Sequence, residues 1–250
     1  MTRPTPAKAV IPVLSAANFI IGMGAFMVIG MLNPVAEAFS IPAATAGQLM
    51  TWYAIGYALL SPLLVSLTGS LGRRRILTMG LAVFAIANLM AALSQDTTLL
   101  LMSRVIAAAG AGLVTPVAAT VAAGLSPPGQ QARALAGVFF GFTLSQVLGV
   151  PAGGFIAYTF GWQAAFALVV LLALPVTFLI WHVVPAGLSF RPVSLGDLGR
   201  TLVSAKQIAA LAFSAIFVGS TYVVYTYISP LLGTRMGFGR DGITLVLLLF

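Results

Sequence analysis

Residues Gly137–Trp162 read GVFFGFTLSQVLGVPAGGFIAYTFGW, and this stretch decides the fold. Small residues recur in it at every fourth position, so on a helix they form one stripe without side-chain bulk. This glycine stripe consists of Gly137, Gly141, Ser145, Gly149 and Gly153. In a lipid bilayer no hydrophobic drive brings helices together, and small residues at this spacing let two backbones approach closely. The stretch therefore predicts a membrane helix that packs along the stripe against a second helix.

Pro151 lies inside this predicted helix and lacks a backbone N–H. Because its ring crowds the carbonyl group of Val147, we expect a bend or a loosened turn there. Gly153 and Gly154 follow directly. The predicted packing and gating residues of this helix are Gly141, Gly149, Pro151, Gly153 and Gly154.

The composition identifies the class of protein. Of 250 residues, 60% are hydrophobic and 6% are charged, and the mean hydropathy is +1.08. A water-soluble domain of this size does not have such a composition. Seven apolar runs are long enough to cross roughly 30 Å of hydrocarbon. They cover residues 11–32, 46–67, 76–93, 99–124, 135–160, 163–184 and 208–232. The sequence therefore predicts an all-α polytopic membrane protein.

Three parts are expected along the chain. Residues 1–184 form a six-helix transmembrane bundle, and the polar and basic segment 185–206 is a cytoplasmic linker. Residues 207–250 begin a second bundle, with a seventh helix and the start of an eighth near Gly242. The eighth apolar run is too short to span, so we expect a piece of a longer protein rather than a chain that ends in an interfacial stub.

The net charge of +8 is distributed unevenly between the two sides of the predicted spans. With a cytoplasmic N-terminus, only Arg235 and Arg240 lie outside. The basic residues inside are then Arg3, Lys8, Arg73, Arg74, Arg75, Arg133, Arg191, Arg200 and Lys206. This is the bias that orients membrane proteins, and it predicts a cell membrane protein of the inner or plasma membrane. It also argues against nucleic acid as a partner.

Polar residues inside the spans are the candidates for a substrate pathway. Asn18 and Ala25 share a face of the first helix, which either lines a cavity or packs against a neighbour, and that helix is expected to end at Asn33–Pro34. The second helix carries Tyr53 and Tyr57 one turn apart and is expected to be interrupted at Ser61–Pro62. The remaining candidates are Arg104, Thr115, Gln146, Tyr222 and Tyr225.

Arg104 is the one charge well inside a span. Near the outer end of its helix, it either snorkels to the interface or points inward. In the inward orientation it shares a helical face with Ala108, Ala111 and Thr115, which leave room for a ligand or a partner. Tyr222 and Tyr225 share a face of the seventh helix. They belong either to an interfacial aromatic belt or to a cavity wall.

A tight loop follows the second helix and carries Gly72, Arg73, Arg74 and Arg75. Three arginines cannot cross the membrane, so the loop is held at the cytoplasmic surface. Two functions stay open for it. It is either a topology anchor that contacts lipid phosphates, or a gate whose arginines meet different partners in two conformations.

These motifs together resemble the major facilitator superfamily. Residues 72–75 are similar to the end of its loop signature, and Leu101-Met102-Ser103-Arg104 resembles its helix-four arginine motif. Residues 149–154, GVPAGG, are similar to the motif of its exporters. The segment from Gly47 to Ala58 looks most like the sugar and drug efflux group that includes arabinose efflux permeases. The resemblance implies a twelve-helix fold of two bundles that works by alternating access.

The chain departs from the family pattern at three positions. The loop motif usually has an acid where this chain has Gly69 and a basic residue where it has Ser70. Related exporters often have a carboxylate near the position of Ala25. No Asp or Glu lies inside the seven predicted spans, so proton coupling would use Glu37 at the outer rim, use a part of the protein beyond this chain, or be absent.

The expected function is secondary transport, with export of a small organic molecule such as a drug or sugar in exchange for protons. The expected partners are a small-molecule substrate, the lipid bilayer and protons, and the full-length protein is expected to be a monomer. We expect no cofactor and no enzymatic activity, because the chain has no cysteine, no paired acids and no nucleotide-binding loop. The alternatives are a facilitator or importer of the same fold, and a truncated membrane protein that does not transport.

Overall fold

The computed structural model describes residues 7–188, 196, 199 and 204–249, and every regular element in these ranges is helical. Seven helices are long and apolar enough to cross a membrane, as the sequence predicts. The elements are α1 (Ala7–Gly30), α2 (Leu32–Ala38), α3 (Ala43–Ala46), α4 (Gln48–Leu67), α5 (Arg73–Ala92), α6 (Thr97–Leu125), α7 (Gln131–Phe160), α8 (Trp162–Val183), α10 (Ala205–Pro230), the π-helix η1 (Leu231–Arg235) and α11 (Arg240–Leu249).

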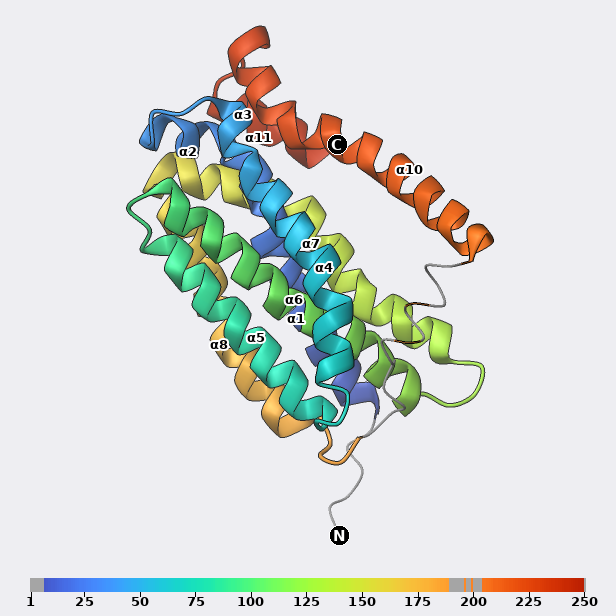
Figure 1. Cartoon of the computed structure of the whole chain (residues 1–250). Helices are drawn as coiled ribbons and strands as arrows, with labels where there is room; N and C mark the ends of the chain where they lie inside the picture. The colour runs from blue at the N-terminus through green and yellow to red at the C-terminus, as the bar shows by residue number, and fades with distance from the viewer. Residues whose placement is uncertain (1–6, 189–195, 197–198, 200–203, 250) are drawn as a thin grey trace.

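Six long helices, α1 and α4 to α8, lie side by side in one bundle (Figure 1). α1 and α6 are the most deeply buried of them. α1 packs chiefly against α7, and α6 packs against α4 and α5. The short elements α2, α3, η1 and α11 gather at one end of the bundle, which we call the α2 end. The opposite end, where α1 and α5 begin, is called the Arg73 end.

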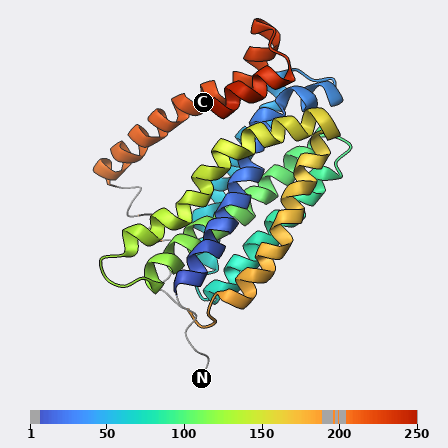
Figure 2. The same ribbon diagram turned by 180° about the vertical axis from the view of Figure 1, so that it is seen from behind.

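α10 lies apart from the bundle over most of its length (Figures 1 and 2). Its residues 205–221 are exposed throughout, whereas Tyr225, Thr226, Ser229 and Pro230 are buried. The helix therefore meets the bundle only near the α2 end and diverges from it toward the Arg73 end.

The glycine stripe of α7 packs against α1 in a constant register. A Cβ atom added at Gly137, Gly141, Gly149 or Gly153 would meet Ile11, Ser15, Met23 or Met27, respectively. Because each partner lies 126 positions earlier in the chain, α1 and α7 run parallel with their turns aligned. The packing that the stripe predicts is confirmed, and the structure identifies α1 as the second helix.

Prolines interrupt the helices less than the sequence suggests. α4 runs unbroken through Pro62, so the expected interruption there is wrong, and α7 is also one helix through Pro151. The hydroxyl of Ser61, beside Pro62, donates to the carbonyl oxygen of Gly112 on α6 at 2.8 Å. α1 already ends at Gly30, and Pro34 lies in the first turn of α2, where its missing N–H costs nothing.

Candidate functional site

Arg104 of α6 is buried inside the bundle with 1% of its surface exposed. Its guanidinium carbon lies 4.7 Å from the centre of the Tyr53 ring on α4 and 5.8 Å from that of Phe166 on α8. Both rings present the negative charge of their π-systems to the cation. The side chain therefore points inward, and the snorkelling alternative does not apply.

The hydrogen-bonding groups of Arg104 are largely unsatisfied. Nε and Nη2 are buried and have no hydrogen-bond partner among the described residues. The hydroxyl oxygen of Thr115, on the same helix, is also buried without a hydrogen-bond partner among these residues. A buried charge without hydrogen bonds is expensive, and intramembrane charges are usually retained for function. Arg104 is therefore the strongest single candidate in the bundle core.

The face of α6 that carries Arg104 packs against the neighbouring helix α4. On α4, Tyr53 and Tyr57 stack on one another with their ring centres 6.4 Å apart. Ala108 is fully buried, and its Cβ lies 3.1 Å from where a Cβ of Gly56 would be. The space that the small residues leave on α6 is thus occupied by a partner helix.

A second group of predicted residues meets at the contact between the bundle and α10. This aromatic seam consists of Phe26 on α1, Phe142 and Gln146 on α7, and Tyr222 and Tyr225 on α10. The Tyr222 hydroxyl donates to Oε1 of Gln146 at 3.2 Å, and the Tyr225 hydroxyl lies 3.5 Å from the backbone oxygen of Gln146. Phe26 stacks on Tyr222 with ring centres 5.7 Å apart and planes inclined by 18°.

Sequence reasoning missed Phe26 and Phe142. Phe142 meets Phe26 edge to face, with ring centres 5.4 Å apart. Phenylalanine is common in membrane spans, and the chain has 16 of them. No local signal distinguishes these two from the other fourteen. Only the meeting of three helices that are distant in the sequence brings them together.

Asn18 and Ala25, predicted on one face of the first helix, are both buried in the bundle. Nδ2 of Asn18 donates to the backbone oxygen of Val138 on α7 at 3.4 Å. Asn18 therefore contributes to the packing of α1 on α7, which agrees with the packing alternative for this face. Its role in a substrate pathway stays a prediction.

The arginine loop is tied to the end of α8. The backbone N–H of Arg73, which is 5% exposed, donates to the oxygen of Leu188 at 3.3 Å, and Gly72 precedes α5 as its N-cap. Nη1 of Arg74 donates to the backbone oxygen of Trp181 at 3.4 Å, and its guanidinium carbon lies 4.5 Å from the Trp181 ring. Arg75 is exposed. Whether the loop anchors or gates stays a prediction.

Replacing Arg74 by alanine is expected to lower the free energy of unfolding by about 0.5–1 kcal/mol, because a cation–π contact at an exposed site is lost. Thermal unfolding of the purified protein in detergent measures this. The matched control is Arg75→Ala, which removes an exposed arginine and is expected to stay within ~0.5 kcal/mol of the wild type. Equal effects of the two substitutions would contradict a specific role for the contact with Trp181.

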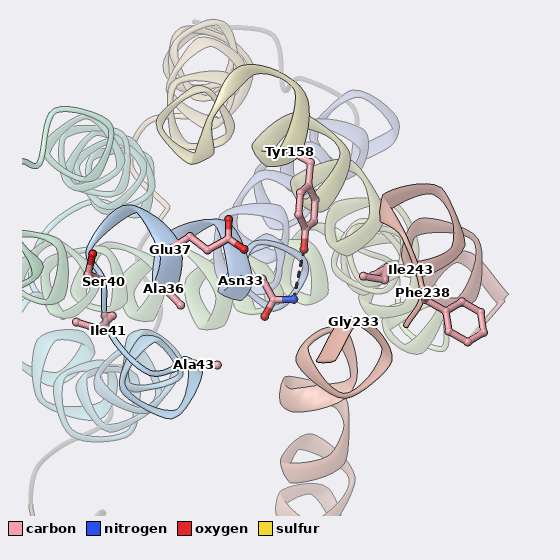
Figure 3. A pocket seen from close by; sticks show the side chains of 10 residues that line it. All are labelled: Asn33, Ala36, Glu37, Ser40, Ile41, Ala43, Tyr158, Gly233, Phe238 and Ile243. Carbon is pink, nitrogen blue, oxygen red and sulfur yellow. Dashed lines mark hydrogen bonds between the residues drawn. The ribbon is translucent and has the colours of Figure 1, made fainter. Parts of the chain in front are cut away.

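A cavity of about 710 Å³ lies at the α2 end, bordered by α2, α3, α7, η1 and α11 (Figure 3). Two of its lining residues are hydrogen-bonded to one another: Nδ2 of Asn33 donates to the Tyr158 hydroxyl at 3.3 Å. Glu37, which the sequence singles out as the acid at the rim, lines the same cavity.

Comparison with known proteins identifies the family. A sequence profile of the Major Facilitator Superfamily matches residues 14–250. The chain belongs to this superfamily. Its all-α fold is that of a major facilitator protein, and it comprises the N-terminal six-helix bundle, the seventh helix and the start of the eighth. As a member of this superfamily with seven membrane-length helices, it is a multi-pass membrane protein.

Relatives in the superfamily include transporters from bacteria. The MFS-type transporter YbcL of Bacillus subtilis is 33% identical over 238 residues, which cover 95% of this chain and 61% of YbcL. The chloramphenicol resistance protein of Streptomyces lividans is 31% identical over 242 residues, with 95% and 62% of the two chains covered. The chain thus spans less than two thirds of the length of these relatives.

Solved structures of superfamily members share the fold. A bacterial homologue of the human lysosomal transporter Spinster, in an inward-facing and unoccupied conformation, superimposes with a TM-score of 0.81 at 19% identity. That match covers 100% of this chain and 59% of the homologue. A D-xylose–proton symporter gives a TM-score of 0.67 at 18% identity and covers 97% and 65% of the two chains.

Proposed function

We propose that the natural protein is a secondary transporter that exports a small organic molecule by alternating access, in exchange for protons. The observation that carries this proposal is the position of α10. It meets the bundle through the aromatic seam near the α2 end and diverges from the bundle toward the Arg73 end (Figures 1 and 2). If the Arg73 end faces the cytoplasm, this position of α10 corresponds to a transport path that is closed on the outer side of the membrane and open on the inner side.

The aromatic seam suits a flat molecule with both apolar and polar groups. Phe26 and Tyr222 now stack on one another, and a flat substrate would take the place of one of these rings, with the Gln146 amide beside it. Chloramphenicol resistance in the Streptomyces relative supports a drug-like substrate, and the shared fold of the xylose symporter keeps a sugar in consideration. Arg104 would orient an anionic or polar substrate, and the full-length protein would act as a monomer.

Proton coupling is the finer part of the proposal. The described spans contain no Asp or Glu, so the proton site within this chain would be Glu37 at the α2 end. Without coupling, the same fold would act as a facilitator, or as an importer if its direction were reversed. A protein that binds a partner but does not transport is the remaining alternative.

Transport by the natural full-length protein in proteoliposomes tests the proposal, with radiolabelled chloramphenicol and D-xylose as probes. We expect one probe to move against its gradient when a pH gradient is imposed, and to stop when an ionophore collapses that gradient. Movement that ignores the pH gradient would establish a facilitator. If neither these probes nor a wider panel of drugs and sugars moves, the transporter proposal fails.

Replacing Phe26 by leucine is expected to weaken substrate affinity about two- to tenfold, because in this proposal a ring of the substrate stacks on Phe26, and such a pair contributes about 0.5–1.5 kcal/mol beyond its buried area. The substrate concentration at half-maximal transport measures this loss. Phe140→Leu is the control, because Phe140 is on α7 with 64% of its surface exposed. A similar loss in both variants would rule out a specific role of the aromatic seam.

A further inference from the structure

The cavity at the α2 end has the size of a ligand site. Its volume of about 710 Å³ lies within the roughly 300–1,000 Å³ that pockets for drug-sized molecules occupy. Residues of α2, α3, α7, η1 and α11 and of two connecting segments border it. Gly233 of η1 lies close to one wall: a Cβ there would lie 3.2 Å from Nδ2 of Asn33. The cavity is distinct from the aromatic seam, since the two share no residue.

Glu37 gives this cavity a negative charge. Among the side chains that the structure describes, it is the only carboxylate or basic group in the lining. No ion pair or hydrogen bond ties up its carboxylate within the described part of the chain, whereas Asp96 caps α6 through the N–H of Leu99 at 2.8 Å. Arg235, at the end of η1, is exposed and outside the lining. In a protein of net charge +8, this cavity is a local negative site.

The surroundings of Glu37 supply further recognition groups. Figure 3 shows Asn33 and Tyr158 in the lining of the cavity beside Glu37. Because Asn33 uses its Nδ2 group to bind Tyr158, its amide oxygen remains an acceptor for a ligand N–H. Ile41 and Ile243 contribute apolar surface.

We propose that this cavity binds an amphipathic organic cation, with Glu37 as the anionic partner of its charged centre. Asn33 and Tyr158 contribute hydrogen-bonding groups beside the charge, and the isoleucines contact the apolar body. The proposal goes beyond the transport function, because binding at equilibrium needs neither turnover nor a proton gradient.

Equilibrium dialysis of the natural full-length protein in a neutral detergent tests it. The probes are tetraphenylphosphonium and tetraphenylborate, which have the same shape and opposite charge. We expect the wild type to bind the cation more tightly. Glu37→Gln is expected to weaken cation binding roughly three- to tenfold, the effect of one partly screened ion pair, and to strengthen binding of the anion. Since Glu37 is exposed, both Glu37→Gln and Glu37→Asp are expected to fold.

Two matched pairs locate the effect. Asp241→Asn removes the same charge from α11 outside the lining, and it is expected to leave both affinities within twofold. Ala43→Trp fills the cavity and is expected to weaken the binding of both ions. Ala44→Trp, on the same short helix but outside the lining, is expected to leave the binding of both unchanged. Equal effects of Glu37→Gln and Asp241→Asn, or no effect of Ala43→Trp, would overturn the proposal. Glu37 is also the proposed proton site, so the binding measurement is made without a proton gradient, and a failure to transport leaves the binding result standing.

Discussion

Gly141→Leu is expected to prevent the first bundle from assembling stably. A Cβ atom at this position would overlap the backbone oxygen of Ser15 on α1, and the rest of a leucine side chain would need still more room. Overpacking costs about 1–3 kcal/mol where neighbouring side chains can move aside. Here the obstructing atom belongs to the backbone of a fully packed helix. We therefore expect a loss of more than about 3 kcal/mol in the free energy of unfolding.

The thermal unfolding midpoint and the yield of monodisperse protein in detergent measure this loss. Gly219→Leu on α10 is the matched control, because nothing lies within 4 Å of a Cβ added there. Gly149→Ala is expected to be intermediate, since its Cβ would lie 3.2 Å from Cα of Met23. Gly149→Leu is expected to abolish transport while the protein remains detectable. If Gly141→Leu unfolds at the same temperature as Gly219→Leu, the register of α1 on α7 is not what stabilises the bundle.

Arg104→Met is expected to remove transport without removing stability. The arginine carries a buried charge with two nitrogen atoms, Nε and Nη2, that have no hydrogen-bond partner among the described residues, so its burial is costly in the absence of a ligand. A methionine of similar length avoids this cost and keeps contact with the rings of Tyr53 and Phe166. We expect the free energy of unfolding to stay level or rise by about 1 kcal/mol. Transport is expected to fall at least roughly tenfold, the effect of losing one strong interaction with a substrate.

Two further variants separate function from structure at this position. Arg104→Lys keeps the charge but loses the planar group that lies over the Tyr53 ring, so partial activity is expected. Arg133→Met removes an exposed arginine and is expected to change neither quantity appreciably. Normal transport by Arg104→Met would refute the substrate role. A large loss of stability in that variant would instead make Arg104 a structural residue.

The sequence was sufficient for features that depend on local pattern. Hydropathy located all seven spans, because a helix must cover the bilayer with apolar side chains wherever it later packs. The four-residue spacing of the glycine stripe predicted close helix packing, because small residues along one helical face let a second backbone approach. Pattern reasoning failed at Pro62, where it expected a break in the helix. There α4 continues, and the adjacent Ser61 hydroxyl binds the backbone of α6.

Features that depend on two distant segments could not be predicted in this way. The stripe does not name its partner, and only the assembled bundle shows that α1 lies against it. The aromatic seam requires Phe26, Gln146 and Tyr222 to meet from three helices, and no spacing within one helix encodes this. The cavity around Glu37 forms where η1 and α11 come to lie beside α2, α3 and α7.

By itself, therefore, the sequence determined the class of protein, its spans and the presence of an arginine within one span, since the cost of placing polar groups in lipid acts on each segment separately. The tertiary structure alone decided which helices are neighbours, what surrounds Arg104 and where a ligand finds space. Those outcomes depend on side-chain shapes and backbone contacts between segments more than 100 positions apart, such as Ser15 and Gly141.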